Sequence, residues 1–147
     1  MNSKPITILL AEDDEEDRYL IGEALDEGRV PNHLYVVEDG EQLLDYLYRR
    51  GKFADSEQWP DPDLILLDLN MPRKDGREVL EEIKVDPGLR RTPIVVLTTS
   101  RAQEDIARSY NQGVSGFVTK PVTFRELMEV MKTIGAYWGK TSTLPPK

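Results

Sequence analysis

The sequence contains no cysteine, which excludes disulfide bonds and any chemistry that depends on a thiol. It also contains no apolar run that approaches the roughly 20 residues of a membrane-spanning helix. An excess of positive charge is missing as well, since 19 Lys and Arg face 27 Asp and Glu, for a net charge of −8. Proteins bind the phosphate backbone of nucleic acids with clustered basic side chains, so we expect neither a nucleic-acid partner nor a membrane partner.

We expect no signal peptide, because Met1 to Pro5 run directly into a strand-like stretch without an apolar segment and cleavage site. The 147 residues, of which 39% are hydrophobic and 31% charged, suit one globular domain. We therefore expect a soluble, cytoplasmic protein in which residues 1–138 form the domain and 139–147 a carboxyl-terminal tail.

Short apolar runs alternate with helical patterns along the chain, which is typical of β–α–β units around a parallel sheet. The runs predict five strands, at 6–11, 34–37, 64–67, 93–97 and 116–119. Each strand is followed by a predicted helix, and the last one begins at Thr123, with Glu126 placed for a capping box. Polar residues and two prolines at 52–63 predict an exposed loop. Right-handed crossovers then give an α/β, flavodoxin-like, doubly wound sheet of five parallel strands in the order 2-1-3-4-5.

Chemically useful side chains follow the predicted strands at their carboxyl ends, where open parallel sheets bind ligands. They are Glu12, Asp13 and Asp14 after the first strand, Asp68 after the third, Thr98 and Thr99 after the fourth, and Lys120 after the fifth. The first, third, fourth and fifth strands are neighbours in the predicted order. We therefore expect these side chains to meet at one edge of the sheet.

Each of these residues also has an ordinary structural interpretation. Acids before a helix commonly cap it and complement its dipole, which is the interpretation that we favour for residues 14–17. Thr98 can be a simple strand-end hydroxyl, and an isolated Lys120 would be a surface residue. Asp68 fits such an account less well, because an unpaired charge at the end of a buried apolar strand is costly.

The set as a whole predicts phosphoryl transfer. Two carboxylates about 4 Å apart repel by roughly 4 kcal/mol at an effective dielectric constant near 20, so Glu12, Asp13 and Asp68 need positive charge nearby. Lys120 supplies one charge, and Mg²⁺, which prefers hard oxygen ligands, can supply the rest. An aspartate in this setting can accept a phosphoryl group as an acyl phosphate. A threonine and a lysine can then stabilise the charge on that group.

Several motifs resemble the receiver domain of bacterial response regulators, over about residues 6–137. The motifs are Glu12-Asp13-Asp14, Asp68-Leu69-Asn70-Met71-Pro72, Leu97-Thr98 and Gly116-Phe117-Val118-Thr119-Lys120-Pro121. The resemblance implies that Asp68 accepts a phosphoryl group from a histidine kinase. It also implies a signalling switch that is not an enzyme in the usual sense, although it takes part in its own phosphotransfer and autodephosphorylation.

Carried over to this sequence, the resemblance implies a role for each motif residue. Asp13 and Asp68 ligate Mg²⁺, Glu12 acts through water, and Asn70 adds its backbone carbonyl. Thr98 and Lys120 contact the phosphoryl oxygens. Phe117 occupies the aromatic switch position, where it can act only by packing because it lacks a hydroxyl. The Lys120–Pro121 peptide bond is expected to be cis.

The sequence also resembles the small regulators that partner cyanobacterial and bacterial phytochromes. The features are the long segment 51–63, the stretch from Leu66 to Leu80, Val96-Leu97-Thr98-Thr99-Ser100 and an extension that carries Trp138. The resemblance implies a phytochrome-like histidine kinase as the partner. No residue encodes a response to light, so this expectation depends on the resemblance.

Three other functions fit the sequence less well. A flavin- or nucleotide-binding protein needs glycines or hydroxyls after the first strand, where this chain has acids. An aspartate-based phosphatase needs a second acid two residues after its nucleophile, where this chain has Asn70. A degenerate receiver that acts as a constitutive interaction module usually lacks one of the key residues, all of which are present here.

The last predicted helix carries a broad apolar stripe. We expect Phe124, Leu127, Met128, Met131, Ile134 and Trp138 to face the sheet, with Val130 and Tyr137 to one side. The outlying residues can be scattered exposed hydrophobic side chains, or they can belong to a partner surface with Tyr110 and Phe117. Because no output module follows the predicted domain, we expect output through protein contacts. We also expect a homodimer through the face that the fourth helix, fifth strand and fifth helix form.

Overall fold

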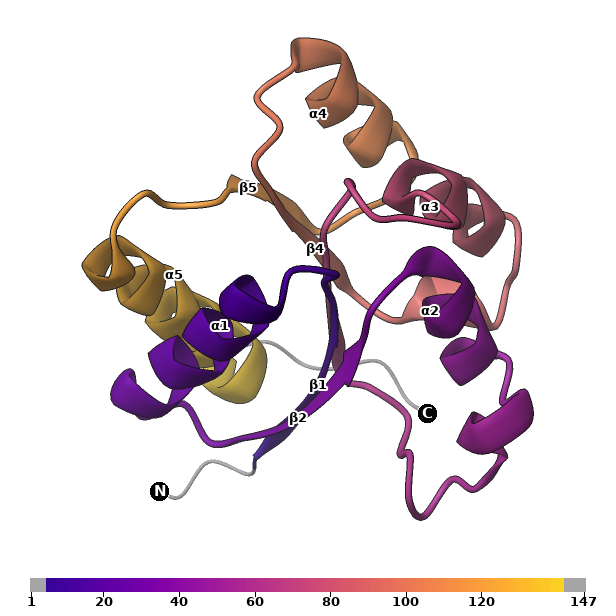
Figure 1. Cartoon of the computed structure of the whole chain (residues 1–147), viewed down its shortest axis with the longest axis horizontal. Helices are drawn as coiled ribbons and strands as arrows, with labels where there is room; N and C mark the ends of the chain where they lie inside the picture. Colours follow the sequence, from indigo (N-terminus) through magenta and orange to yellow (C-terminus); the bar gives the residue numbers. More distant parts are fainter. Residues whose placement is uncertain (1–4, 142–147) are drawn as a thin grey trace.

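The computed structural model describes residues 5–141 and contains a five-stranded sheet in the order β2-β1-β3-β4-β5 (Figure 1). All four pairs of neighbouring strands are parallel. The strands are β1 (Ile6–Ala11), β2 (Asn32–Val37), β3 (Leu64–Leu67), β4 (Ile94–Thr98) and β5 (Gly116–Thr119). The predicted flavodoxin-like fold and its strand order are therefore confirmed.

Five helices follow the strands, as predicted. They are α1 (Glu15–Glu27), α2 (Gly40–Leu47), α3 (Gly76–Lys84), α4 (Gln103–Asn111) and α5 (Phe124–Ala136). Short 3-10 turns lie at Gly51–Ala54 and Leu89–Arg91, and a π-helical turn continues α5 over Tyr137–Thr141. No helix within residues 5–141 is long and apolar enough to cross a membrane. Residues 142–147 of the predicted tail lie outside the described part, and the domain boundary at 138 stays a prediction.

The helices cover both faces of the sheet, with α1 and α5 on one face and α2 and α3 on the other (Figure 1). Successive strand residues point to opposite faces, so each strand supplies both hydrophobic clusters. In β3, for example, Ile65 and Leu67 belong to one cluster and Leu64 and Leu66 to the other. All four residues are fully buried, which confirms that β3 is a central strand covered on both faces.

The segment 52–63 is mostly exposed, as its polar composition predicts, but aromatic side chains attach it to the domain. Phe53 is buried, and its ring lies 5.0 Å from that of Trp59 and 5.1 Å from that of Tyr46. The Tyr46 hydroxyl donates a hydrogen bond to the Pro60 carbonyl at 2.7 Å, and Arg49 binds the Trp59 carbonyl. The loop prediction is confirmed for most of the segment, but it missed that two aromatic side chains, which the surrounding polar residues outnumber, anchor the segment to α2.

The α5 helix largely follows the predicted pattern. Thr123 caps it, since its hydroxyl oxygen accepts a hydrogen bond from the Glu126 N–H at 3.2 Å. The buried residues that face the sheet are Leu127, Met131 and Ile134, and Met128 and Trp138 pack partly against the same cluster. Tyr137 is 51% exposed, as expected for a residue to one side of this stripe. Phe124 was wrongly expected to face the sheet, since it is 39% exposed, whereas Val130 is partly buried against the core cluster.

Candidate functional site

The carboxyl ends of β1, β3, β4 and β5 bring together most of the side chains that the sequence singled out, whereas Thr99 is exposed and Asp14 caps α1. The sheet continues one residue beyond these ends through backbone hydrogen bonds. The Asp68 N–H donates to the Ala11 carbonyl at 3.1 Å, and the Lys120 N–H donates to the Thr98 carbonyl at 2.7 Å. These bonds fix the backbone positions of Asp68 and Lys120 at the edge of the sheet, where their side chains lie in contact.

Lys120 lies at the centre of the site. Its Nζ donates to Glu12 Oε1 at 2.5 Å, to Asp17 Oδ2 at 2.8 Å and to Asp68 Oδ2 at 3.0 Å. Glu12 and Asp68 are buried, and the side chain of Lys120 is only 13% exposed. One ammonium group therefore serves three carboxylates in a region of low solvent access, where each such contact is stronger than at the surface.

The peptide bond that precedes Pro121 corrects one expectation. Within residues 5–141 no peptide bond is cis, so the predicted cis bond between Lys120 and Pro121 was wrong. The trans form of such a bond is lower in energy by about 0.5–1 kcal/mol. Lys120 reaches all three carboxylates with this bond in the trans form.

Burial and neighbouring charges shift two pKa values in the site. Burial raises the pKa of Glu12 to about 7, and the nearby Asp68 carboxylate adds to the rise. Hydrogen bonding to Lys120 offsets part of this shift. Burial by itself would lower the pKa of Lys120, but its hydrogen bonds to Asp17 and Glu12 outweigh burial and raise that pKa. The lysine is thus firmly charged, whereas Glu12 is close to neutralisation near physiological pH.

The acidic residues also form a set of oxygen ligands suited to a divalent cation. Oxygen atoms of Glu12, Asp13 and Asp68 all lie within 4.8 Å of one another. Glu12 and Asp68 are buried while Asp13 is exposed, so the set is open to solvent on one side. Hard carboxylate oxygens with room for water suit a cation such as Mg²⁺ or Mn²⁺. With Asp17 included, the site contains four carboxylates, three of which bind Lys120, and a divalent cation would offset the excess negative charge.

Asp17 is a site residue that the sequence reasoning missed. We expected residues 14–17 to serve as helix caps and dipole partners, and Asp14 does so, since it accepts a hydrogen bond from the Asp17 N–H at 3.0 Å. The Asp17 carboxylate, however, turns toward Lys120 from the first turn of α1. Its position one helical turn after the cap is a weak signal, because acids at this position are common without any site.

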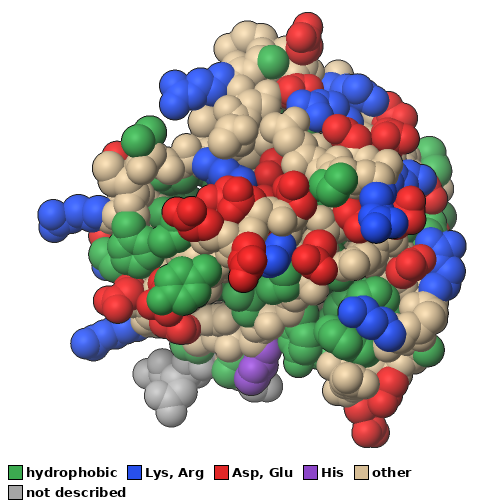
Figure 2. All heavy atoms as spheres, viewed as in Figure 1, with side chains coloured by type: hydrophobic (Ala, Val, Ile, Leu, Met, Phe, Trp, Pro, Cys, Tyr) green, Lys and Arg blue, Asp and Glu red, His purple; other side chains and the backbone are tan. Residues whose placement is uncertain are grey.

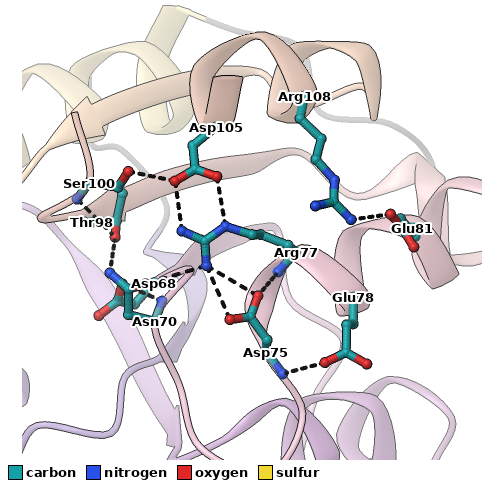
Figure 3. A network of polar contacts seen from close by, with 10 residues as sticks. All are labelled: Asp68, Asn70, Asp75, Arg77, Glu78, Glu81, Thr98, Ser100, Asp105 and Arg108. Atoms are coloured by element: carbon teal, nitrogen blue, oxygen red, sulfur yellow. Dashed lines mark hydrogen bonds and ion pairs between the residues drawn. The ribbon is translucent and has the colours of Figure 1, made fainter. Parts of the chain in front are cut away.

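Thr98 and Asn70 lie beside Asp68 and are joined to each other. Thr98 is fully buried, and its hydroxyl oxygen accepts from Asn70 Nδ2 at 3.4 Å and from the Ser100 N–H at 3.5 Å (Figure 3). The Asn70 N–H donates to Asp68 Oδ1 at 3.1 Å. Asn70 therefore connects Thr98 to Asp68 by one hydrogen bond to each residue. The assignment of the Asn70 carbonyl to a metal ion stays a prediction.

Phe117 lies on β5 opposite Val96 and is partly buried against the hydrophobic cluster that α2 and α3 cover. This position is compatible with the predicted packing switch, which stays a prediction.

On the outer surface, acidic side chains gather near the middle of the face shown in Figure 2. This distribution agrees with the net charge of −8.

A flavodoxin-like sheet with acids, a threonine and a lysine at the carboxyl ends of β1, β3, β4 and β5 is the arrangement of a receiver domain. The family model described as "Response regulator receiver domain" matches residues 8–132. The chain belongs to this family, whose members act as signalling switches rather than as classical enzymes.

Individual relatives extend the match over nearly the whole chain. Response regulator Rcp1 of Synechocystis sp. is 41% identical over 144 residues, which are 98% of this chain and 96% of that protein. The crystal structure of the phosphorylated cyanobacterial phytochrome response regulator RcpA is 45% identical, with a TM-score of 0.88, and the match covers 97% of this chain and 99% of that one. The Mn²⁺-bound form of Rcp1 is 42% identical, with a TM-score of 0.86 and coverage of 97% and 100%. The acidic cluster of this chain fits divalent-metal binding of the kind seen in that relative.

Proposed function

We propose that Asp68 accepts a phosphoryl group in a Mg²⁺-dependent reaction, and that its phosphorylation switches protein–protein contacts. The observation that carries this proposal is the cluster around Lys120. The lysine lies 3.0 Å from Asp68 Oδ2, and Glu12, Asp13 and Asp68 offer oxygens within 4.8 Å of one another. A buried carboxylate flanked by a cation site and an ammonium group is placed to act as a nucleophile toward an anionic phosphate.

In the proposed reaction an Asp68 oxygen forms a bond to phosphorus while the phosphorus–nitrogen bond of a phosphohistidine donor breaks. The electron pair of that bond stays on the imidazole nitrogen. Glu12, Asp13, Asp68 and the Asn70 carbonyl would hold Mg²⁺, which neutralises charge on the phosphoryl oxygens. Lys120 pairs with one phosphoryl oxygen, and the Thr98 hydroxyl donates to another. In autodephosphorylation, water later attacks the phosphorus, the acyl phosphate bond breaks, and inorganic phosphate leaves.

A small phosphoryl donor tests this proposal without a kinase. Wild type and Asp68→Ala are incubated with acetyl phosphate and Mg²⁺, and intact mass is measured. We expect one phosphoryl adduct on wild type, loss of the adduct when EDTA is present, and no adduct on Asp68→Ala. Absence of an adduct on wild type, or an undiminished adduct on Asp68→Ala, would defeat the proposal. A constitutive interaction module would then become the better account.

The proposed donor is a phytochrome-like sensor histidine kinase in the cytoplasm. This proposal is supported by the similarity to RcpA, a cyanobacterial phytochrome response regulator that is 45% identical over 97% of this chain. The test is a transfer profile in which purified phosphorylated kinases, phytochrome and non-phytochrome, are mixed with the protein for short times. Fast transfer from a phytochrome kinase and slow transfer from the others is the expected result. Equal rates from all kinases would contradict the partner assignment.

The proposed output is a homodimer through the α4-β5-α5 face. Phosphorylation would draw Thr98 toward the phosphoryl group, Phe117 would follow, and this face would repack. The proposal is supported by β5 being the last strand in the sheet order and by Tyr110 and Tyr137, which are both 51% exposed on flanking segments. Sedimentation velocity of Tyr110→Ala tests it, with Tyr19→Ala on α1 as a control of similar exposure (65%). A wild type that stays monomeric with and without phosphorylation would refute the dimer.

A further inference from the structure

Arg77, in the first turn of α3, is joined to the phosphorylation site by a chain of hydrogen bonds (Figure 3). Its Nε and Nη2 donate to the two carboxylate oxygens of Asp105 on α4, both at 2.7 Å. Its Nη1 donates to Asp75 Oδ2 at 3.1 Å and to Asn70 Oδ1 at 3.3 Å. The side chain is 23% exposed, and these partners hold its planar guanidinium in a single orientation.

This orientation determines which way the Asn70 amide faces. A guanidinium group has five N–H donors and no acceptor, so the Asn70 atom next to Arg77 must be the carbonyl oxygen. The Asn70 NH₂ group then faces the opposite side, where it donates to the Thr98 hydroxyl oxygen at 3.4 Å. With the amide reversed, an NH₂ group would face the N–H groups of Arg77, and two donors would oppose each other.

The amide orientation in turn determines where the Thr98 hydroxyl hydrogen can point. The Thr98 oxygen accepts from Asn70 Nδ2 and lies 3.5 Å from the Ser100 N–H, so both of its neighbours in the network are donors. Its own hydrogen must therefore point away from them. Because the Asn70 N–H donates to Asp68 Oδ1 at 3.1 Å, Thr98 and Asp68 share Asn70 as a neighbour, and a phosphoryl oxygen on Asp68 would need a donor on this side.

We propose that Arg77 is a positioning residue for phosphoryl transfer to Asp68, acting through the Asn70 amide to present the Thr98 hydroxyl hydrogen to the phosphoryl group. This inference rests on the proposed role of Asp68 as acceptor. Asp105 holds the guanidinium by the two-pronged pair, and Ser100 Oγ donates to the same carboxylate at 2.6 Å. The reaction is the one given above, with the electron pair of the broken bond leaving on acetate when acetyl phosphate is the donor.

A second ion pair between α3 and α4 provides a matched control. Arg108 on α4 pairs with Glu81 on α3, and the two side chains are 46% and 52% exposed. Like the Arg77–Asp105 pair, this contact connects the two helices (Figure 3). Within residues 5–141 neither side chain forms a hydrogen bond to Asn70 or Thr98, so loss of this pair removes a connection between the helices and leaves the Asn70 amide unaffected.

The test measures the rate of labelling by acetyl phosphate and Mg²⁺ for wild type, Arg77→Met, Arg77→Lys, Arg108→Met, Asn70→Ala and the double variant Arg77→Met/Asn70→Ala. We expect Arg77→Met to slow labelling about tenfold, the effect of one misdirected hydrogen bond. Arg77→Lys, which still offers only donors to Asn70, should recover part of the rate. Arg108→Met should label like wild type. In the Asn70→Ala background, Arg77→Met should have no further effect, because the amide through which it acts is gone.

Each alternative result has a distinct meaning. Labelling of Arg77→Met at the wild-type rate overturns the inference and leaves the proposed function intact. An equal slowing by Arg108→Met, or a full additional slowing by Arg77→Met in the Asn70→Ala background, also overturns it, since both indicate general loosening of α3 and α4. If Arg77→Met does not fold, Arg77→Lys with and without Asn70→Ala decides the same question. Failure of wild type to take up a phosphoryl group overturns the proposed function and this inference together.

Discussion

The buried Glu12 carboxylate should make the protein less stable as pH rises, and Glu12→Gln should remove this effect. Glu12 is 1% exposed, and burial, with help from Asp68, raises its pKa from 4.5 to about 7. A carboxyl group with a raised pKa in the folded state binds more protons there than in the unfolded state. Its stabilising effect is therefore fully present below pH 4.5 and is lost as pH rises through about 7.

The size of the effect follows from the pKa shift. Each pKa unit corresponds to about 1.36 kcal/mol, so the wild type should lose roughly 3 kcal/mol of unfolding free energy between pH 4.5 and 8 through this group. Glutamine has nearly the same shape as protonated glutamate and does not titrate. Glu12→Gln should thus be close to wild type at pH 5 and more stable at pH 8. The gain in unfolding free energy at pH 8 should be smaller than about 3 kcal/mol, because the substitution also removes the charged hydrogen bond from Lys120 to Glu12.

Urea denaturation at pH 5 and pH 8, in EDTA, measures the difference directly. Addition of Mg²⁺ should then stabilise wild type more at pH 8 than at pH 5, because cation binding requires the deprotonated carboxylates. The same addition should stabilise Glu12→Gln less. The effect assigned to Glu12 would be excluded if Glu12→Gln were less stable than wild type at pH 8, or if the difference between the two proteins were the same at both pH values.

Three further predictions concern the rest of the molecule. Hydrogen bonds from Arg77 and Ser100 lower the pKa of Asp105 from 3.8 to about 2, so its contribution is present above pH 3.8 and is lost as pH falls toward 2. In urea titrations the stability lost in Asp105→Asn should be roughly 2 kcal/mol at pH 5 and clearly smaller at pH 3, and an equal loss at both values would contradict this. Phe53→Ala should cost about 3–5 kcal/mol if Phe53 anchors segment 52–63, and a cost below 1 kcal/mol in urea denaturation would show that this segment is only loosely attached. Asp17→Asn should speed hydrogen exchange between the Lys120 ammonium and solvent, because the charged acceptor that lies 2.8 Å from Nζ is removed, and an exchange rate equal to that of wild type in NMR would place Asp17 outside the site.

The sequence was sufficient to predict the fold because local pattern and topology agree. Four consecutive apolar residues at 64–67 require a strand covered on both faces, and the β–α alternation then leaves one common order for five parallel strands. The same topology places the residues after β1, β3, β4 and β5 at one edge. Glu12, Asp68 and Lys120 could therefore be predicted to meet, although 108 positions separate Lys120 from Glu12.

The features that could not be predicted are contacts between side chains of different helices, strands and loops. The pair between Arg77 and Asp105 spans 28 positions and exists because the starts of α3 and α4 lie close together, which no sequence period specifies. Asp17 turns toward Lys120 for the same kind of reason. Phe53 and Trp59 were overlooked because average polarity describes a segment and not the packing of its two aromatic rings. The conformation of the bond before Pro121 likewise follows from its surroundings and not from the residue pair.

Chemical trapping of an acyl phosphate distinguishes Asp68 from the other carboxylates of the site. Borohydride reduces an acyl phosphate of aspartate to homoserine, which peptide mass spectrometry can place at a single position. After incubation with acetyl phosphate and Mg²⁺ followed by borohydride, we expect homoserine at position 68 and at no other aspartate, with none in EDTA. Homoserine at Asp13 or Asp17 in place of Asp68, or its absence from a protein that carries a phosphoryl adduct, would contradict the account.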